Sequence, residues 1–334
     1  MAQTVVDLDL RDLEGIGPAT EKKLRDSGIE SILELAAALP DEVLEAMGGS
    51  KDNASALIFL AQNALRESGL LDKEFIPAFE VLDRRKNLIK CTTGSRNLDD
   101  LLKGGVETQA ITELWGEFGS GKTQLCHTLC ITCQLPSDQG GMGGGALYID
   151  TEATFRPERL FQIAEARGLD PNEALKKVIF CKVYNSSHLE LAVKSLGKHI
   201  EEHGIKLLIV DSIISLHRAE FTGRGTLADR QQRLNSLIHR LLRIAELYNI
   251  AVVVTNQVQA QPDTFFGDPN KPTGGHVIGH ACTYRIYLRK AGQDRRAIII
   301  DSPYHPYSEA TFKVEDKGVV DPEVKKKASA DSGD

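Results

Sequence analysis

The stretch from Ile111 to Leu129 restricts the fold of this chain more than any other. It reads ITELWGEFGSGKTQLCHTL: apolar residues typical of a short strand, then glycines, then residues typical of a helix. Within it, the motif G-x-x-x-x-G-K-[ST] runs from Gly116 to Thr123. Glycine lets backbone N–H groups approach phosphate oxygens, and the following helix directs its positive end at them. The stretch therefore predicts a phosphate-binding loop.

The side chains of this loop have distinct expected roles. Lys122 supplies positive charge for the β- and γ-phosphates of a nucleoside triphosphate, and the hydroxyl of Thr123 is placed to bind Mg²⁺. The other residues expected to contact the nucleotide are Gly116, Glu117, Phe118, Gly119, Ser120, Gly121 and Gln124.

Apolar runs alternate with amphipathic segments along the rest of the chain. Strands are expected at 110–115, 146–150, 178–183, 207–211 and 250–255, and helices at 124–134, 157–167, 187–203 and 227–248. Strands that are apolar throughout and separated by helices predict an α/β fold, with a mostly parallel twisted sheet covered on both faces. Later strands, at 283–289, 297–300 and 310–314, alternate apolar and polar residues.

The chain divides into four expected parts. Residues 1–69 are expected to form a compact all-α domain, in which a G-x-G turn at Gly15 resembles a helix-hairpin-helix element. Such a turn can hold a DNA phosphate, although a purely structural turn explains it equally well. Residues 70–90 are expected to form a linker with one extended piece, 91–315 the core, and 316–334 a charged flexible tail.

Composition indicates an ordinary globular protein. Hydrophobic residues make up 41% and charged residues 26% of the 334, and the net charge is −7. This balance excludes a surface that is basic throughout, but a local cationic face for nucleic acid remains possible. No apolar run is long enough to span a bilayer and the N-terminus is acidic, so a cytoplasmic, nucleoid-associated protein is expected. The nearby cysteines Cys126, Cys130 and Cys133 are expected to be buried thiols rather than metal ligands.

Two acidic residues that follow apolar runs are candidates for nucleotide chemistry. Asp211 ends the run LLIVD, and in phosphate-loop enzymes an acid at such a position holds Mg²⁺. Glu152 follows an expected parallel strand at its carboxyl end, the edge at which ligands bind in such sheets. Its carboxylate is a candidate for polarising the water that attacks the γ-phosphate, and a helix-start acid is the alternative.

Two loops have features of nucleic-acid contacts. Arg218, Arg224 and Arg230 are spaced along a glycine-containing loop that leads into a helix, and arginine offers forked donors to phosphates. The second loop, 257–280, is long and carries aromatic and basic residues suited to a single strand. A solvated surface loop is the alternative for each. Both loops follow core strands expected to be neighbours, so they should face the same way.

Six segments together resemble archaeal RadA-type recombinases of the RecA superfamily: GEFGSGKTQ, YIDTEATFRPERL, LLIVDS, RAEFTGRGTLADRQ, VVVTNQV and DSPYHPYSEATF. The resemblance covers nearly the whole chain. It implies a RecA-like ATPase core that carries out homologous pairing and strand exchange in recombinational repair. The implied cofactors are ATP and Mg²⁺, with K⁺ as a further candidate. The implied partners are single- and double-stranded DNA and further copies of the chain, in a helical filament or in rings.

The resemblance also assigns individual roles. Glu152 matches the catalytic carboxylate, assisted by Lys122, and Gln257 matches the residue that senses the γ-phosphate. Arg159 matches the arginine that stacks on adenine, and Asp301 and Pro306 match the cap over the neighbouring subunit's ATP. Phe75 and Ala78 match the F-x-x-A linker that docks on a neighbouring subunit. The residues that match the two DNA loops are Arg218, Arg224 and Arg230 in the first, and Gly274, Gly275 and His280 in the second.

Two positions depart from the pattern of that family. Ala153 stands where glycine is common after the catalytic glutamate, and Tyr307 where many relatives have an acid in the ATP cap. Two other classes of protein remain as alternatives. One is an accessory paralogue that binds DNA and ATP without strand exchange, and the other is a ring-shaped motor such as a helicase. Accessory paralogues often lack the hairpin domain, the linker phenylalanine or the long second loop, all of which this chain has.

Overall fold

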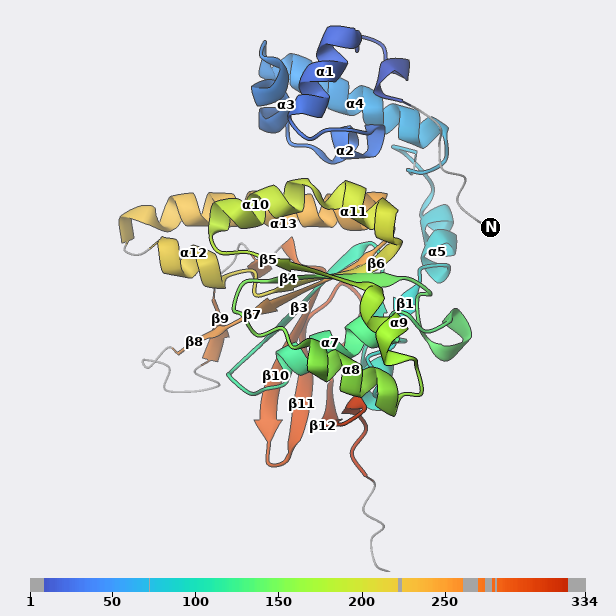
Figure 1. The fold of residues 1–334 in the computed structure, drawn as a ribbon, viewed down its shortest axis with the longest axis vertical. Coiled ribbons are helices and arrows are strands. Elements are labelled where there is room, and N and C mark those ends of the chain that lie inside the picture. Colours follow the sequence, from blue (N-terminus) through green and yellow to red (C-terminus); the bar gives the residue numbers. More distant parts are fainter. Residues whose placement is uncertain are drawn as a thin grey trace, which may run out of the picture.

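The computed structural model describes residues 9–71, 73–221, 224–260, 270–273, 278–279 and 281–323. A small helical domain lies above a larger α/β core, and the linker runs down one side (Figure 1). The predicted fold class is confirmed. Within the described ranges, no helix combines the length and the apolar character needed to cross a membrane.

From residue 9 on, where the structure describes it, the N-terminal domain contains one short 3-10 turn and four α-helices: η1 (Leu10–Asp12), α1 (Pro18–Asp26), α2 (Ile32–Ala37), α3 (Pro40–Met47) and α4 (Lys51–Glu67). Two of the helices begin with serine caps, because Ser31 and Ser50 accept hydrogen bonds from the backbone N–H three residues later. Leu24, Leu35 and Leu65 are fully or almost fully buried in a core of their own. The expected all-α domain therefore has its own apolar core.

The linker differs from its prediction. An extended piece was expected near 75–79, but α5 (Ala78–Lys86) begins there, directly after Pro77. Proline favours an extended residue before it and suits the start of a helix, so it limits the extended part to the residues before α5. No residue of α5 is buried, and its apolar side chains Phe79, Val81 and Leu82 are exposed.

The core sheet has nine strands in the order β13-β12-β11-β10-β3-β7-β6-β4-β5. Six neighbouring strands are parallel: β10 (Tyr284–Ala291), β3 (Ala110–Gly116), β7 (Ala251–Asn256), β6 (Ile205–Asp211), β4 (Gly145–Asp150) and β5 (Val178–Lys182). Three antiparallel strands complete the sheet: β11 (Asp294–Asp301), β12 (Glu309–Glu315) and β13 (Gly318–Val320). A small ladder of β1 (Lys90–Cys91) and β2 (Val106–Glu107) lies at the entrance to the core, with α6 (Arg96–Leu101) between them.

Helices cover both faces of the parallel strands, as Figure 1 shows. One face carries α7 (Lys122–Thr132), α8 (Pro157–Ala166) and α9 (Pro171–Lys176), and the other carries α10 (Ser186–Lys194), α11 (Leu196–His203) and α13 (Leu227–Leu247). Side chains along β4 alternate between the two faces of the sheet. Tyr148 belongs to the apolar cluster under α7, α8 and α9, and Leu147 to the cluster under α10, α11 and α13. The helix expected over 187–203 is two helices, because the chain turns at Ser195, whose hydroxyl donates to the carbonyl of Ala192.

The C-terminal boundary of the core also differs from its prediction. Residues 316–334 were expected to be a flexible tail, but β13 pairs with β12, and Val319 is fully buried. Beyond β13, the carboxylate of Asp321 accepts hydrogen bonds from the backbone N–H groups of Arg96 (3.2 Å) and Asn97 (2.9 Å) at the start of α6. The ordered core therefore extends beyond the expected end at residue 315.

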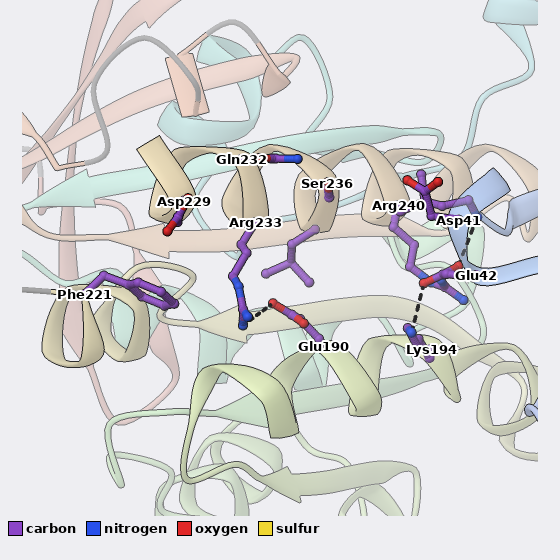
Figure 2. A pocket seen from close by; sticks show the side chains of 12 residues that line it. Asp41, Glu42, Glu190, Lys194, Phe221, Asp229, Gln232, Arg233, Ser236 and Arg240 are labelled. Carbon is purple, nitrogen blue, oxygen red and sulfur yellow. Dashed lines mark hydrogen bonds and ion pairs between the residues drawn. The ribbon is translucent and has the colours of Figure 1, made fainter. Parts of the chain in front are cut away.

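The two domains meet through Leu247 of α13, which packs against the apolar core of the N-terminal domain, and through charged side chains (Figure 2). Glu42, in the first turn of α3, pairs with Arg240 of α13, and Nζ of Lys194 lies 3.4 Å from the same carboxylate. Arg243 also donates to the carbonyl of Ala38 at 2.9 Å. These contacts border a cavity of 480 Å³ between the domains. Arg240 is only 7% exposed, so this ion pair is largely removed from water.

Candidate functional site

The predicted phosphate loop lies between β3 and α7, at the carboxyl edge of the parallel sheet. Two of its glycines are required by geometry. Gly121 caps α7 with φ at 104°, a backbone conformation that favours glycine. At Gly116, a Cβ atom would lie 2.0 Å from the carbonyl oxygen of Leu288 on the neighbouring β10. The loop opens into a cavity of 560 Å³, large enough for a nucleotide.

Lys122 lies at the wall of this cavity. Its Nζ donates to the carbonyl oxygens of Gly116 (2.7 Å) and Glu117 (3.0 Å), so the side chain folds over the loop. Burial lowers the pKa of Lys122, while the charges of Asp211 and Glu152 act in the opposite direction. The side chain of Phe118 borders the same cavity but is almost fully exposed.

Asp211 is held at the end of β6 by three hydroxyl groups. Tyr148 Oη donates to it at 2.6 Å and Thr123 Oγ1 at 2.9 Å, and Thr255 donates to its other carboxylate oxygen. The structure thus brings together the two expected metal ligands, Thr123 and Asp211. Sequence reasoning missed Tyr148 and Thr255, although Tyr148 lies in the YIDTE segment and Thr255 near the end of a predicted strand.

Glu152 lies across the cavity, on the turn that follows β4. The turn is held by Asp150, whose carboxylate accepts hydrogen bonds from the backbone N–H groups of Glu152, Thr154 and Phe155. Ala153 has φ at 56°, the left-handed region that costs a residue with a side chain about 1 kcal/mol, which explains why glycine suits this position. Gln257 Nε2 donates to Glu152 Oε1 at 2.7 Å, so the two predicted residues touch.

Of the other predicted nucleotide contacts, one lies beside the cavity and two lie away from it. Arg159 Nε donates to Gln124 at 2.8 Å, beside the cavity, and its guanidinium also contacts the backbone after β12. Asp301 and Pro306 are exposed and do not line the cavity of their own chain. Arg295 does line it, donating to the carbonyl of Gly119 at 3.1 Å. The sequence offered no signal for Arg295.

The first of the two predicted DNA loops lies at the same edge of the sheet. Arg218 is exposed on α12 (Ser215–Glu220), the backbone of Arg224 lies in the turn η3 (Arg224–Thr226), and Arg230 is half-buried in the first turns of α13. These arginines follow β6, whose neighbour β7 leads into the second loop, so both loops leave adjacent strands as expected.

The second loop begins as paired strands rather than as open loop. β8 (Val258–Ala260) and β9 (Asn270–Pro272) form an antiparallel ladder at its base. The predicted DNA contacts Gly274, Gly275 and His280 lie outside the described residues.

The linker residues Phe75 and Ala78 are both exposed, Phe75 by 88%. They therefore have no burial site on their own chain. On the far edge of the sheet, an apolar cavity of 350 Å³ lies between β4, β5, α10 and α11. Its walls include Ile149, Ile179 and Ala192. β5 pairs only with β4 among the described strands, so its other edge is open.

Comparison with known proteins agrees with this geometry. A protein-family model described as Rad51 matches residues 84–322. The chain belongs to the Rad51 family. A model described as a SAM-like helix-hairpin-helix tandem matches residues 7–63. The chain is also 52% identical over 320 residues to the "DNA repair and recombination protein RadA" of Cenarchaeum symbiosum (strain A). The aligned region makes up 96% of this chain and 80% of that protein. The predicted resemblance and fold are thus confirmed, with one family model matching the core and another the N-terminal domain.

Proposed function

We propose that this protein is an ATP-dependent DNA recombinase that assembles on single-stranded DNA and catalyses homologous pairing and strand exchange in DNA repair. The observation that carries the proposal is the hydrogen bond between Glu152 and Gln257. It connects the candidate catalytic carboxylate to the first residue of the second DNA loop. The 52% identity to a DNA repair and recombination protein supports the same conclusion.

In the proposed site, the loop from Gly116 to Thr123 binds the triphosphate through its N–H groups, with Gln124 following it. Lys122 releases the carbonyls of the loop and pairs with the phosphates instead. Hydroxyl and carboxylate oxygens are ligands that Mg²⁺ prefers, so Thr123 and Asp211 fit this ion. Bound Mg²⁺ neutralises charge on the phosphates. Arg159, which donates to Gln124 beside the cavity, stacks on the adenine.

Glu152 acts as the group that orients and polarises the attacking water. In the structure, one of its oxygens accepts a hydrogen bond from Gln257. A γ-phosphate offers Gln257 another acceptor, so its amide moves from the carboxylate to the phosphate. That exchange frees Glu152 for water and moves the start of β8, which is the base of the second DNA loop. Arg218, Arg224 and Arg230 of the first loop bind DNA phosphates beside it.

The proposed filament forms through the linker. Phe75 enters the apolar cavity of a neighbouring subunit, and the extended residues before Ala78 add to the open edge of β5. Asp301 and Pro306 then cap the neighbour's ATP, which explains why they lie away from the cavity of their own chain. Tyr307, 76% exposed, adds no charge to that cap, so K⁺ has a smaller role here than in a cap with an acid at this position.

Replacement of Glu152 by glutamine tests the catalytic assignment. The amide keeps the shape and the bond to Gln257 but lacks a basic oxygen, so DNA-stimulated ATP hydrolysis should fall about 100-fold or more while nucleotide and DNA binding remain. Glu158→Gln, an exposed acid on α8, is the matched control and should hydrolyse ATP normally. Normal turnover in Glu152→Gln would refute the role of this carboxylate. Electron microscopy of the same variant with ATP and single-stranded DNA should show helical filaments.

A further inference from the structure

The last turn of α11 gathers three potential metal ligands far from the nucleotide cavity. His199 and His203 are four residues apart, so they lie on the same side of the helix. Their rings are almost parallel, at 5°, with centroids 6.1 Å apart. With the carboxylate of Glu202, they offer one ligand atom each, all within 4.8 Å of one another. Among the residues that the structure describes, no other group of three such side chains comes this close.

Within the cluster, one ring nitrogen lacks a partner and the remaining polar approach is a long one. Nδ1 of His199 is buried and has no hydrogen-bond partner, which is costly for a polar atom. Nε2 of His203 lies 3.9 Å from the carboxylate of Glu202, too far for a hydrogen bond. The cluster therefore has donors available without breaking any bond that holds the fold.

The surroundings favour a cation. His203 is the last residue of α11, which ends at Gly204, and the carboxyl end of a helix carries partial negative charge. Lys198, the nearest lysine along the helix, extends toward Glu30 of the N-terminal domain. The Glu202 carboxylate balances part of the charge of a divalent ion directly.

We propose that His199, Glu202 and His203 bind a divalent transition-metal ion. Two imidazoles and one carboxylate suit Zn²⁺, Co²⁺, Ni²⁺ or Cu²⁺, whereas Mg²⁺ and Ca²⁺ prefer oxygen ligands alone. Zinc binds imidazole nitrogen at about 2.0–2.1 Å, so the three ligand atoms must move closer than they are now. Glu202 and His203 are exposed, so rotation of their side chains achieves this without moving the helix. Water completes the coordination.

This site does not depend on the proposed recombinase activity. It does touch the proposed subunit contact, because His199 also lines the apolar cavity on β5. A bound metal would fix the His199 ring and so stiffen one wall of that cavity. We place no step of nucleotide hydrolysis at this site.

Titration of the metal-free full-length protein with Co²⁺ and Zn²⁺ tests the proposal. The experiment contains excess Mg²⁺, which occupies oxygen sites but competes poorly for imidazole. We expect one Co²⁺ per chain, with an absorption spectrum that reports nitrogen ligation, and a Zn²⁺-dependent rise in melting temperature. His203→Ala is exposed and should fold normally, yet its affinity should fall about tenfold or more.

His239→Ala is the matched control, because His239 is an exposed histidine on α13, outside the cluster. It should bind both metals as the wild type does. His199→Ala should lose affinity as His203→Ala does. The absence of stoichiometric binding in the wild type would overturn the proposal. Equal affinity in wild type and His203→Ala would do the same, because the metal would then be held elsewhere.

Discussion

The contact between the two domains gives a prediction with a definite magnitude. Arg240→Met removes the guanidinium that pairs with Glu42 but keeps most of the side-chain volume. Loss of one partner of a buried ion pair costs about 3–5 kcal/mol, because the other charge stays buried. Glu42 retains Lys194 at 3.4 Å and the backbone N–H of Leu39 at 3.0 Å. We therefore expect the lower end, about 3 kcal/mol, or roughly 100-fold in the docking equilibrium.

Hydrogen exchange measures this quantity directly. The N-terminal domain is small, so exchange of its most protected amides requires undocking followed by opening of the domain. The two free energies add, and Arg240→Met should reduce the protection of amides in α4 by about 100-fold. Amides of β4, at the centre of the core, should keep their protection.

Two controls separate docking from general instability. Lys194→Met removes a side chain that is 39% exposed, and an ion pair of that kind is worth about 1 kcal/mol or less. Its effect on α4 should therefore be about fivefold or less. Glu42→Gln combined with Arg240→Met completes a double-mutant cycle, in which the effects should not add. Equal loss of protection in α4 and β4, or no loss in either, would refute the reasoning.

Three further outcomes follow from the described side chains. Phe75→Glu should abolish large assemblies on a sizing column with little change in monomer melting, whereas Phe59→Glu should assemble normally. Tyr307→Asp should make ATP hydrolysis more dependent on K⁺, measured against Na⁺ at constant ionic strength, and an unchanged response would exclude Tyr307 from the cap. Burial raises the pKa of Glu34, so wild-type stability should fall as pH rises through that raised value, and Glu34→Gln should remove this loss in denaturant titrations.

Local patterns in the sequence were sufficient to predict the centre of the fold. Five apolar runs separated by helical segments correspond to β3, β4, β5, β6 and β7, within one residue at either end except for β6, which begins two residues earlier than expected. The phosphate loop was predictable because its motif places glycine where the loop backbone requires it. Gly116 and Gly121 both lie at positions that a residue with a side chain would not fit without strain. The presence of helices on both faces of the sheet was predictable because the strands are apolar on both sides.

Features that depend on distant partners were not predictable. α5 has only nine residues and its apolar side chains are exposed, so the segment is too short to show a sustained helical period. β13 is only three residues long, and it is ordered because it pairs with β12 and because the N–H of Val319 donates to Thr128 of α7. The hydroxyls of Tyr148 and Thr255 meet Asp211 because β6 lies between β4 and β7 in the sheet, an order that the sequence does not state.

The bond from Asp321 to α6 joins the last described turns of the core to its first helix. The point where the polypeptide enters the core and the point where it leaves are thus side by side. Chains with neighbouring ends tolerate circular permutation, because a short connection can replace the natural ends. The order in which the core segments are synthesised is therefore not required by the fold.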